Sequence, residues 1–247
     1  LLPETEVTGI AIQNGEVTRV TTNRGEIRTP VVVDAAGAWA RPIGERAGVR
    51  VPVVPVRHQL MITEPIAGVD TTQPICRVID ANVYVRPDRG GLMLGGYEPD
   101  PHAYDMRGVP PGFQIKDLPL DLTVLRGLVE RVRDIFPALP DAPMREHRGG
   151  LPTMTADGKH IVGAVPGVRG LYLATGCCVG GLSISPAMGQ MLAEVIVHGE
   201  SSIPLDGLRM DRFGPEVASD ITLRAAAVTT YVRQYSGGWQ SLGRAPS

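Results

Sequence analysis

A glycine-rich bend at residues 176–183, directly before a predicted helix, has the residue types and spacing of a binding site. In such a bend, free backbone N–H groups and the positive end of the helix point the same way, so the bend can hold an anion. A close strand-to-helix turn without a ligand produces the same pattern, and spacing alone favours that interpretation. The bend is therefore a candidate binding site that needs support from the rest of the chain.

Other combinations of reactive residues give weaker signals. Ser183 and Ser185 would suit a hydrolase, but no Gly-x-Ser-x-Gly elbow surrounds either serine. The three cysteines, with Cys177 next to Cys178, fit neither a disulfide framework nor a zinc spacing, and we interpret this pair as packing residues. We expect no metal site, because the histidines other than His58 share no ligand spacing: His102, His147, His160 and His198.

The composition is that of a globular chain without a nucleic-acid partner or a membrane span. The 247 residues are 43% hydrophobic and 20% charged, which suits one large or two small domains. A net charge of −2 and a pI near 6.2 give no basic surface for nucleic acid, and no apolar run reaches the roughly 18 residues of a spanning helix. Residues 1–7 lack a signal-peptide pattern, so together with the cysteine usage they indicate a reducing, cytoplasmic location.

The first elements that must position these residues are short strands. Asn14-Gly15 is a strong hairpin turn, and a second turn at residues 23–25 completes a three-stranded meander. The apolar run at residues 31–35 is typical of a strand buried on both faces of a mainly parallel sheet. A short helix is expected over residues 41–47.

The middle of the chain predicts an antiparallel sheet with one helix packed on it. The turn at residues 88–91 predicts that Tyr84 and Tyr97 sit on neighbouring strands. Apolar residues at helical spacing follow Asp121, a suitable cap, as far as Phe136. The predicted strands, separated by Pro, Gly and Asp, are residues 53–63, 75–79, 83–86 and 92–97.

After Gly149-Gly150 the pattern returns to short buried strands, at residues 160–165 and 171–174, and then to the glycine-rich bend. Ser185 and Pro186 are expected to cap and begin a helix that ends near residues 198–199. A further helix over residues 221–235, stopped by Gly237-Gly238, is the least clear element.

Four stretches, taken in order, carry more information than any single motif. They are VVVDAAGAWARPIGERAG (31–48), VVPVRHQLMITEP (53–65), VYVRPDRGGLMLGGYE (83–98) and LPTMTADGKHIVGAVPGVRGLYLATGCCVGGLSISPAMGQMLAEVI (151–196). In this order they resemble the D-amino-acid-oxidase-like family of FAD-dependent oxidoreductases, most closely its dimethylglycine and sarcosine dehydrogenase and oxidase branch.

The resemblance implies an α/β (α+β) fold in which a partial Rossmann-like FAD-binding domain carries an inserted antiparallel β-sheet domain for an amine substrate. The implied activity is oxidation of a secondary or tertiary N-methyl amine or amino acid, with hydride transfer from the C–H next to nitrogen to flavin N5 and formation of an imine. Oxygen or an electron-transfer flavoprotein would accept the electrons. The implied boundaries are 1–48 and 149–200 for the FAD-binding domain, 49–148 for the substrate domain and 201–247 for a tail.

Residue by residue, the resemblance implies a substrate site and a flavin site. His58 and Tyr84 match substrate-facing positions, where a neutral imidazole and a phenol could orient an amine and take up its proton. Without the resemblance, a hydrogen-bonded core histidine and an ordinary sheet tyrosine explain the same two residues. Tyr97 and Arg86 are further substrate-binding candidates. The positions matched to FAD contacts are Val7, Ala36, Gly37, Trp39, Gly176, Cys178, Val179, Gly180, Gly181, Leu182 and Ser183.

The sequence departs from the family in three places. No strand, Gly-x-Gly-x-x-Gly and helix segment is present, and the closest match, at residues 90–95, lies between two predicted strands. We therefore expect a long N-terminal part to be absent, and the alternative function is an incomplete subunit, part of an oligomer or bound to a second chain that completes the FAD site. Pro152 replaces a carboxylate-binding arginine of some relatives. Gly150 replaces a flavin-linking cysteine, which excludes covalent flavin there.

Overall fold

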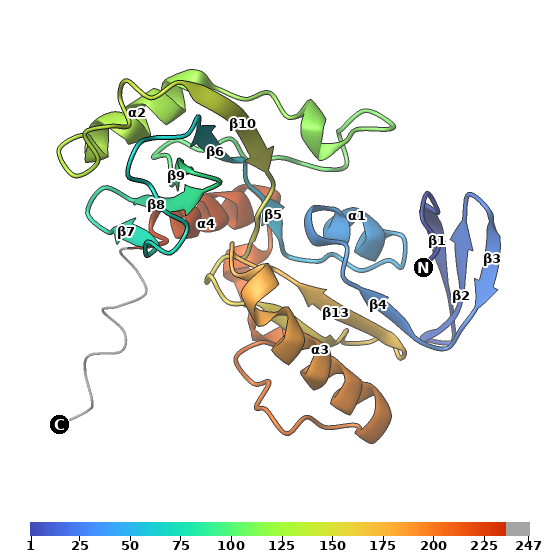
Figure 1. Ribbon diagram of the computed structural model, residues 1–247. Helices are drawn as coiled ribbons and strands as arrows, with labels where there is room; N and C mark the ends of the chain where they lie inside the picture. The colour runs from blue at the N-terminus through green and yellow to red at the C-terminus, as the bar shows by residue number, and fades with distance from the viewer. Residues whose placement is uncertain (236–247) are drawn as a thin grey trace, which may run out of the picture. The chain divides into compact units, whose positions relative to one another are not determined.

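The computed structural model describes residues 1–235, so the end of the expected tail and its predicted stop at Gly237-Gly238 lie outside the described residues. The chain divides into two units (Figure 1). The first unit comprises Leu1–Pro55, Tyr104–Gly108 and Pro152–Ala227, and the second comprises Val56–Ala103, Val109–Leu151 and, of the described residues, 228–235.

The first unit begins with an antiparallel sheet in the order β1-β2-β3. Asn14 and Gly15 connect the first two strands with φ angles of 51° and 78°, the left-handed pair that a tight two-residue hairpin turn requires. The predicted meander is therefore confirmed. Its strands are β1 (Val7–Gln13), β2 (Glu16–Thr22) and β3 (Gly25–Arg28).

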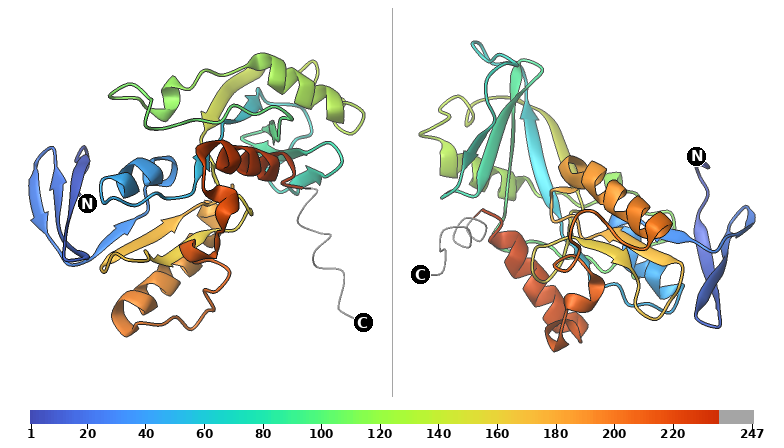
Figure 2. Two further views of the ribbon diagram at one scale, coloured as in Figure 1. Left: turned by 180° about the vertical axis from the view of Figure 1, so that it is seen from behind. Right: turned by 90° about the horizontal axis from the view of Figure 1, so that it is seen from below.

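A second sheet of this unit has the order β12-β13-β4, with β13 parallel to β4 and antiparallel to β12. The expectation that the run at 31–35 is buried on both faces is wrong for this structure, because β4 is an edge strand of the sheet and Val33 is 41% exposed. Met188, Met191 and Leu192 pack helix α3 against the sheet at Val162, and Figure 2 shows α3 running along it. The elements are β4 (Val32–Asp34), β12 (Ile161–Ala164), β13 (Leu171–Thr175) and α3 (Gly181–His198).

Helix α3 begins four residues earlier than the predicted cap at Ser185, so Pro186 lies inside the helix. A proline cannot donate a hydrogen bond to the carbonyl four residues before it. The hydroxyl of Ser185 donates to that carbonyl, of Leu182, at 3.1 Å and replaces the missing bond. The serine next to the proline is therefore a helix-interior partner, and the cap position belongs to Gly180.

The remaining short elements of the first unit connect these sheets. Pro55 pairs with Thr153 in a two-stranded sheet. Helix α4 begins in this unit, and its last residues belong to the second unit. The elements are the 3-10 helix η1 (Gly37–Trp39), α1 (Ala40–Glu45), β5 (Val54–Pro55), β11 (Thr153–Met154), the 3-10 helices η3 (Met210–Arg212) and η4 (Pro215–Val217), and α4 (Asp220–Val232).

The second unit is built on a five-stranded antiparallel sheet in the order β10-β6-β9-β8-β7. Helix α2 packs on it through a core that includes Leu94, Leu125 and Leu128, and the side chain of Asp121 caps the helix by accepting from the Thr123 N–H at 2.8 Å. The elements are β6 (His58–Thr63), β7 (Cys76–Val78), β8 (Val83–Asp88), β9 (Gly91–Gly96), the 3-10 helix η2 (Ile115–Asp117), α2 (Leu122–Val132) and β10 (Met144–Gly150).

The predicted strand at 53–63 is two strands, because the backbone changes partners at its middle. Pro55 pairs with β11, whereas Arg57 donates its N–H to the His102 carbonyl at 2.8 Å and β6 then pairs with β9 and β10. Strand β10, which the sequence patterns missed, is the edge strand that places Gly150 opposite His58. No helix among the described residues is long and apolar enough to cross a membrane.

Candidate active site

His58 is held between two tyrosine hydroxyls of the second unit. Its Nε2 lies 2.9 Å from Oη of Tyr84 on β8, and its Nδ1 lies 2.8 Å from Oη of Tyr231 in the last turn of α4. A neutral imidazole carries one N–H and one lone pair, so it can satisfy one phenol as a donor and the other as an acceptor. The structure thus brings the two predicted catalytic residues, His58 and Tyr84, into direct contact.

Aromatic rings surround this hydrogen-bonded group. The ring centroids of Tyr97 and His58 are 5.2 Å apart, and those of Tyr97 lie 5.1 Å from Tyr231 and 5.0 Å from Tyr235. Four of the six tyrosines of the chain therefore gather around one histidine, although aromatic residues make up only 4% of the sequence. We call this group, His58 with Tyr84, Tyr97, Tyr231 and Tyr235, the tyrosine cluster.

Burial keeps the tyrosine cluster uncharged at neutral pH. It lowers the pKa of His58 from 6.5 to about 4, so the imidazole is neutral there. It also raises the pKa of Tyr84 to about 12, and the pKa values of Tyr97, Tyr231 and Tyr235 are raised for the same reason. The cluster can therefore offer neutral hydrogen bonds and apolar aromatic faces to a bound ligand.

Arg86 lies on the same strand as Tyr84, two residues further on. Its guanidinium charge lowers the pKa of the Tyr84 phenol, against the larger effect of burial, which indicates that the two side chains are close. Asp88 forms an ion pair with Arg86 at 3.5 Å and also binds Arg89 at 2.9 Å. Arg86 is thus a cation near the tyrosine cluster whose charge Asp88 partly compensates.

The residues matched to FAD contacts lie in the first unit. Val7 begins β1 and pairs with Thr22. Ala36, Gly37 and half-buried Trp39 come directly after β4, and Gly37 has a φ of 56° with no atom within 4 Å of where a Cβ would lie. This glycine leaves open space beside the backbone at the end of a strand, as a close approach of a ligand requires.

The glycine-rich bend is held in left-handed backbone conformations. Gly176, Cys178 and Val179 have φ angles of 64°, 43° and 66°, and such values are uncommon for residues other than glycine. The N–H of Cys178 donates to the Thr153 carbonyl at 3.0 Å, and a side chain on Gly181 would press on Cys177. The bend is therefore held in one conformation by a hydrogen bond and by close packing.

The helix start that follows the bend has no side-chain cap from any of the described residues. The hydroxyl of Ser183 donates back to the Gly180 carbonyl at 2.8 Å and so leaves the first N–H groups of α3 uncapped. Leu182 is almost fully exposed. Burial raises the pKa values of Cys177 and Cys178, so both are protonated thiols, in agreement with their interpretation as packing residues. No group of three metal-ligating side chains occurs in the part of the chain that the structure describes.

Two buried oxygens at neighbouring strand ends fit a bound dinucleotide. Asp34 ends β4 and Thr175 ends β13, the strand parallel to it. Their side chains are 2% and 0% exposed, yet Asp34 Oδ2 and Thr175 Oγ1 have no hydrogen-bond partner among residues 1–235. In open α/β sheets, ligands bind at the carboxyl ends of parallel strands. Since buried polar groups are normally paired, this edge fits a group that supplies polar atoms, as FAD would.

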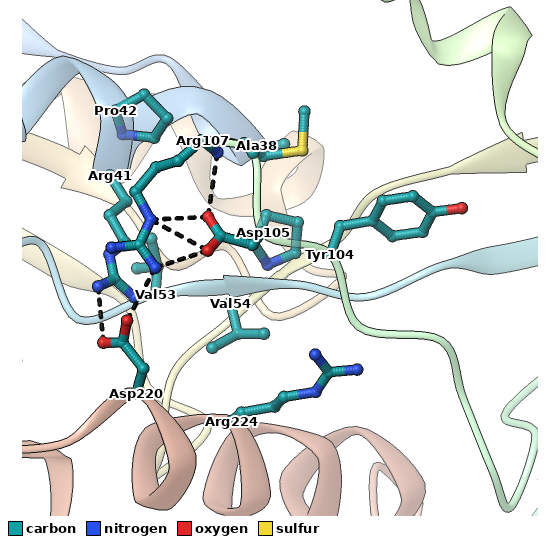
Figure 3. A pocket seen from close by; sticks show the side chains of 12 residues that line it. Ala38, Arg41, Pro42, Val53, Val54, Tyr104, Asp105, Arg107, Asp220 and Arg224 are labelled. Carbon is teal, nitrogen blue, oxygen red and sulfur yellow. Dashed lines mark hydrogen bonds and ion pairs between the residues drawn. The ribbon is translucent and has the colours of Figure 1, made fainter. Parts of the chain in front are cut away.

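A separate cavity of the first unit holds a network of ion pairs (Figure 3). It has a volume of about 120 Å³. Asp220 accepts hydrogen bonds from Arg41 at 2.6 Å, Arg50 at 2.9 Å and Arg107 at 2.8 Å, and Asp105 also pairs with Arg107. Sequence reasoning missed this network, because its members come from three segments far apart along the chain.

Comparisons with known proteins agree with the resemblance seen in the sequence. The profile of the FAD dependent oxidoreductase family (DAO) matches residues 1–195. Mitochondrial sarcosine dehydrogenase of Mus musculus is 32% identical over 238 residues, which cover 93% of this chain and 25% of that protein. Mitochondrial dimethylglycine dehydrogenase of Mus musculus is 31% identical, covering 82% of this chain and 24% of the relative.

Two further matches extend this similarity. Sarcosine oxidase subunit beta of Rhizobium meliloti (strain 1021) is 30% identical, with 86% of this chain and 48% of the subunit covered. The crystal structure of L-proline dehydrogenase from P. horikoshii superposes with a TM-score of 0.74 at 30% identity, over 86% of this chain and 55% of that one. The mixed α/β fold expected from the sequence is confirmed. The chain spans about a quarter of the length of the two dehydrogenases.

Proposed function

Because the chain belongs to the DAO family of FAD-dependent oxidoreductases, we propose that it carries the substrate site of an enzyme that oxidises a secondary or tertiary N-methyl amine or amino acid. The printed substrates of its relatives, sarcosine and dimethylglycine, support this class. The structural observation that supports it most is His58, held between the hydroxyls of Tyr84 and Tyr231 in an uncharged aromatic cluster.

The tyrosine cluster suits an amine that reacts as a free base. A carbon next to nitrogen gives up hydride readily only when the nitrogen lone pair is free, so the site must bind the amine without fixing a positive charge on it. The sequence suggested that His58 could take up the proton of the amine. With a pKa of about 4, His58 is too weak a base to hold that proton at neutral pH. His58 and Tyr84 instead orient the amine through neutral hydrogen bonds, and the surrounding rings exclude water.

The residues of the first unit would hold the cofactor. Asp34 and Thr175 offer buried oxygens, Gly37 leaves room beside the backbone, and the N-terminus of α3 favours negative charge at the carbonyl edge of the flavin. FAD, when bound, supplies the acceptor for the hydride. The other matched positions are Val7, Ala36, Trp39, Gly176, Cys178, Val179, Gly180, Gly181, Leu182 and Ser183, and they stay proposed flavin contacts.

Arg86 is the side chain that we propose for a substrate carboxylate, since Pro152 matches the position where some relatives are expected to carry a carboxylate-binding arginine. Arg148, which lies four positions before Pro152 in the sequence and could also reach a carboxylate, pairs instead with Glu146 on β10. The three free cysteines support a reducing compartment such as the cytoplasm.

A second candidate function is an assembly module whose FAD site is completed by another polypeptide. The edge of β4, where Val33 is exposed and no strand of residues 1–235 pairs, supports it, because such an edge strand can accept a strand from another segment. The similarity to a protein that is itself a subunit supports it too.

Visible absorption separates the two candidates. The purified chain is mixed with FAD, the unbound FAD is removed, and the spectrum of oxidised flavin is recorded before and after anaerobic addition of sarcosine or dimethylglycine. An enzyme complete in this chain retains the flavin band and loses it on addition of the amine. A colourless chain that takes up no FAD overturns this first function, and flavin that appears only with a co-expressed partner supports the assembly module.

A further inference from the structure

The ring of His160, in the first unit, lies against the glycine-rich bend. Its Nδ1 is 3.0 Å from the carbonyl oxygen of Gly176, the first residue of the bend. A Cβ built on Gly180, the N-cap residue of α3, would lie 3.8 Å from Cε1 of His160, so the ring also lies beside the residue before the helix. His160 therefore touches the bend at its first residue and packs next to the point where α3 begins.

The acceptor fixes the direction of this hydrogen bond. A carbonyl oxygen has lone pairs and no hydrogen, so the Gly176 oxygen can only accept, and Nδ1 of His160 must carry the donated proton. This requirement is the same for neutral imidazole and for imidazolium, because both can carry a proton on Nδ1. The bond therefore holds the ring with Nδ1 toward the bend.

The conformation of the bend requires contacts from outside it. Cys178 and Val179 have positive φ angles, and a β-branched residue such as valine rarely adopts one. A backbone in such a conformation persists only where the surrounding structure holds it. The Thr153 carbonyl accepts the N–H of Cys178 at 3.0 Å, and His160 holds the Gly176 carbonyl two residues earlier. These two hydrogen bonds fix the backbone of the bend at two points.

The turn that carries His160 is itself anchored. Arg212, whose side chain is 11% exposed, donates to the two carboxylate oxygens of Asp157 at 2.8 and 3.0 Å and to the Lys159 carbonyl at 2.8 Å. The hydroxyl of Thr155 donates to the same carbonyl at 2.8 Å. A side chain can hold another segment only if its own backbone is held, and these contacts meet that condition for His160.

We propose that His160 is a positioning residue for the glycine-rich bend: its Nδ1–H holds the Gly176 carbonyl and so keeps the backbone before α3 in the conformation that is offered to the flavin. A bend that is held before binding loses less freedom when a ligand binds, and the affinity for the ligand rises accordingly. This consequence for FAD rests on the proposed function, whereas the support of the bend in the chain without FAD does not.

Amide hydrogen exchange of the full chain without FAD tests the support directly. His160→Leu removes the donor, whereas His160→Asn keeps one, because its side-chain N–H group is attached to Cγ as Nδ1 of histidine is. The N–H groups of Cys178 and Gly180, which are bonded within or beside the bend, are expected to exchange about 10-fold faster in His160→Leu and at an unchanged rate in His160→Asn. His198→Leu, the matched loss of an exposed histidine at the other end of α3, leaves both rates unchanged.

Three results would overturn the proposal. Unchanged exchange in His160→Leu means that the bend does not depend on His160. Equally fast exchange in His160→Asn and His160→Leu means that the imidazole ring, and not its hydrogen bond, supports the bend. The third result comes from ¹⁵N NMR of the unsubstituted chain at neutral pH, with the His160 signal assigned through its bonds to the backbone: a Nδ1 without a proton contradicts the bond even if no variant folds.

The affinity for FAD then tests the consequence for the cofactor. In equilibrium dialysis, His160→Leu is expected to bind FAD about 10-fold more weakly than the unsubstituted chain, and His160→Asn as tightly. Unchanged affinity in His160→Leu alongside faster exchange overturns the role toward the flavin. If the unsubstituted chain binds no FAD, that role fails together with the proposed function of a complete enzyme, and the exchange and NMR results still decide whether His160 supports the bend.

Discussion

The phenol of Tyr84 occupies the space that a side chain on Gly95 would need. The two residues are register partners on strands β8 and β9, and a Cβ on Gly95 would overlap the hydroxyl and ring of Tyr84. The φ angle of Gly95 is not in the left-handed region. Glycine is therefore required at this position only because a side chain would have no space. The absence of a side chain at one position of β9 thus allows Tyr84 to reach His58.

Substituting Gly95 by alanine is predicted to displace the Tyr84 ring and to lower the free energy of unfolding by about 1–3 kcal/mol, the usual cost of overpacking. Urea unfolding measures the loss. Gly127→Ala is the matched control, because nothing lies within 4 Å of a Cβ there and alanine favours the interior of helix α2. That variant should gain about 0.5–1 kcal/mol. A Gly95→Ala chain as stable as the unsubstituted one contradicts the assignment.

The half-buried imidazole of His58 predicts a loss of stability in mild acid. Its pKa is about 4 in the folded chain against 6.5 when exposed, so the unfolded chain binds the extra proton between these values. This contribution is complete above about pH 6.5 and is lost as the pH falls toward 4, by about 3 kcal/mol in all. Urea unfolding of His58→Gln over this range should lack that component. Parallel stability curves for the two chains would show that the fold does not lower the pKa of His58.

Asp34 is predicted to make the chain less stable as the pH rises, the opposite of the effect of His58. Burial raises its pKa to about 7, so between about pH 4 and 7 the folded chain keeps a proton that the unfolded chain releases, and stability falls as the pH rises. Asp34→Asn removes this cost and keeps an oxygen for the Ala36 N–H, which Asp34 binds at 3.0 Å. Without FAD, the variant should equal the unsubstituted chain near pH 4 and exceed it by about 2–4 kcal/mol at pH 8. A variant less stable at pH 8 would refute the prediction.

Asp220 predicts a modest, salt-sensitive stabilisation. Its hydrogen bonds to Arg50, Arg41 and Arg107 hold the pKa of the carboxyl below its usual 3.8, so the contribution is present above that pH and is lost in stronger acid. Because the side chain is 46% exposed, solvent screening limits the effect of Asp220→Asn to about 1 kcal/mol. Asp211→Asn, whose partner Arg209 is two residues away, should change little. Equal losses in both variants, or a loss that persists in 1 M salt, would contradict the network.

Local patterns in the sequence predicted most elements of the fold. The Asn14-Gly15 turn and the Asp121 cap are short-range signals, since the residues that satisfy them lie within a few positions. The start of α3 was predicted wrongly because Ser185 and Pro186 form a good helix start by local rules, and only the structure shows Ser185 bonded to Leu182. Local propensity cannot report which of two nearby helix starts the packing selects.

The candidate site was partly predictable for a different reason. His58 and Tyr84 could be found because the stretches around them resemble a family. The turn at 88–91 predicted neighbouring strands for Tyr84 and Tyr97, but Tyr84 pairs with Gly95 and Tyr97 follows the end of β9 at Gly96. Tyr231 could not be found, since it lies 173 positions from His58 in the least patterned part of the chain. The fold brings the four tyrosines together around His58, and their spacing along the sequence does not predict this cluster.

Anaerobic stopped-flow reduction of the flavin-loaded enzyme tests most directly whether His58 and Tyr84 orient an amine for oxidation. Rates with sarcosine or dimethylglycine are compared for the unsubstituted enzyme, His58→Gln and Tyr84→Phe, and bound FAD is measured in the same samples. The account predicts rates lower by about 10²-fold with unchanged FAD content. Unchanged rates, or a loss of rate that only matches a loss of FAD, would contradict it.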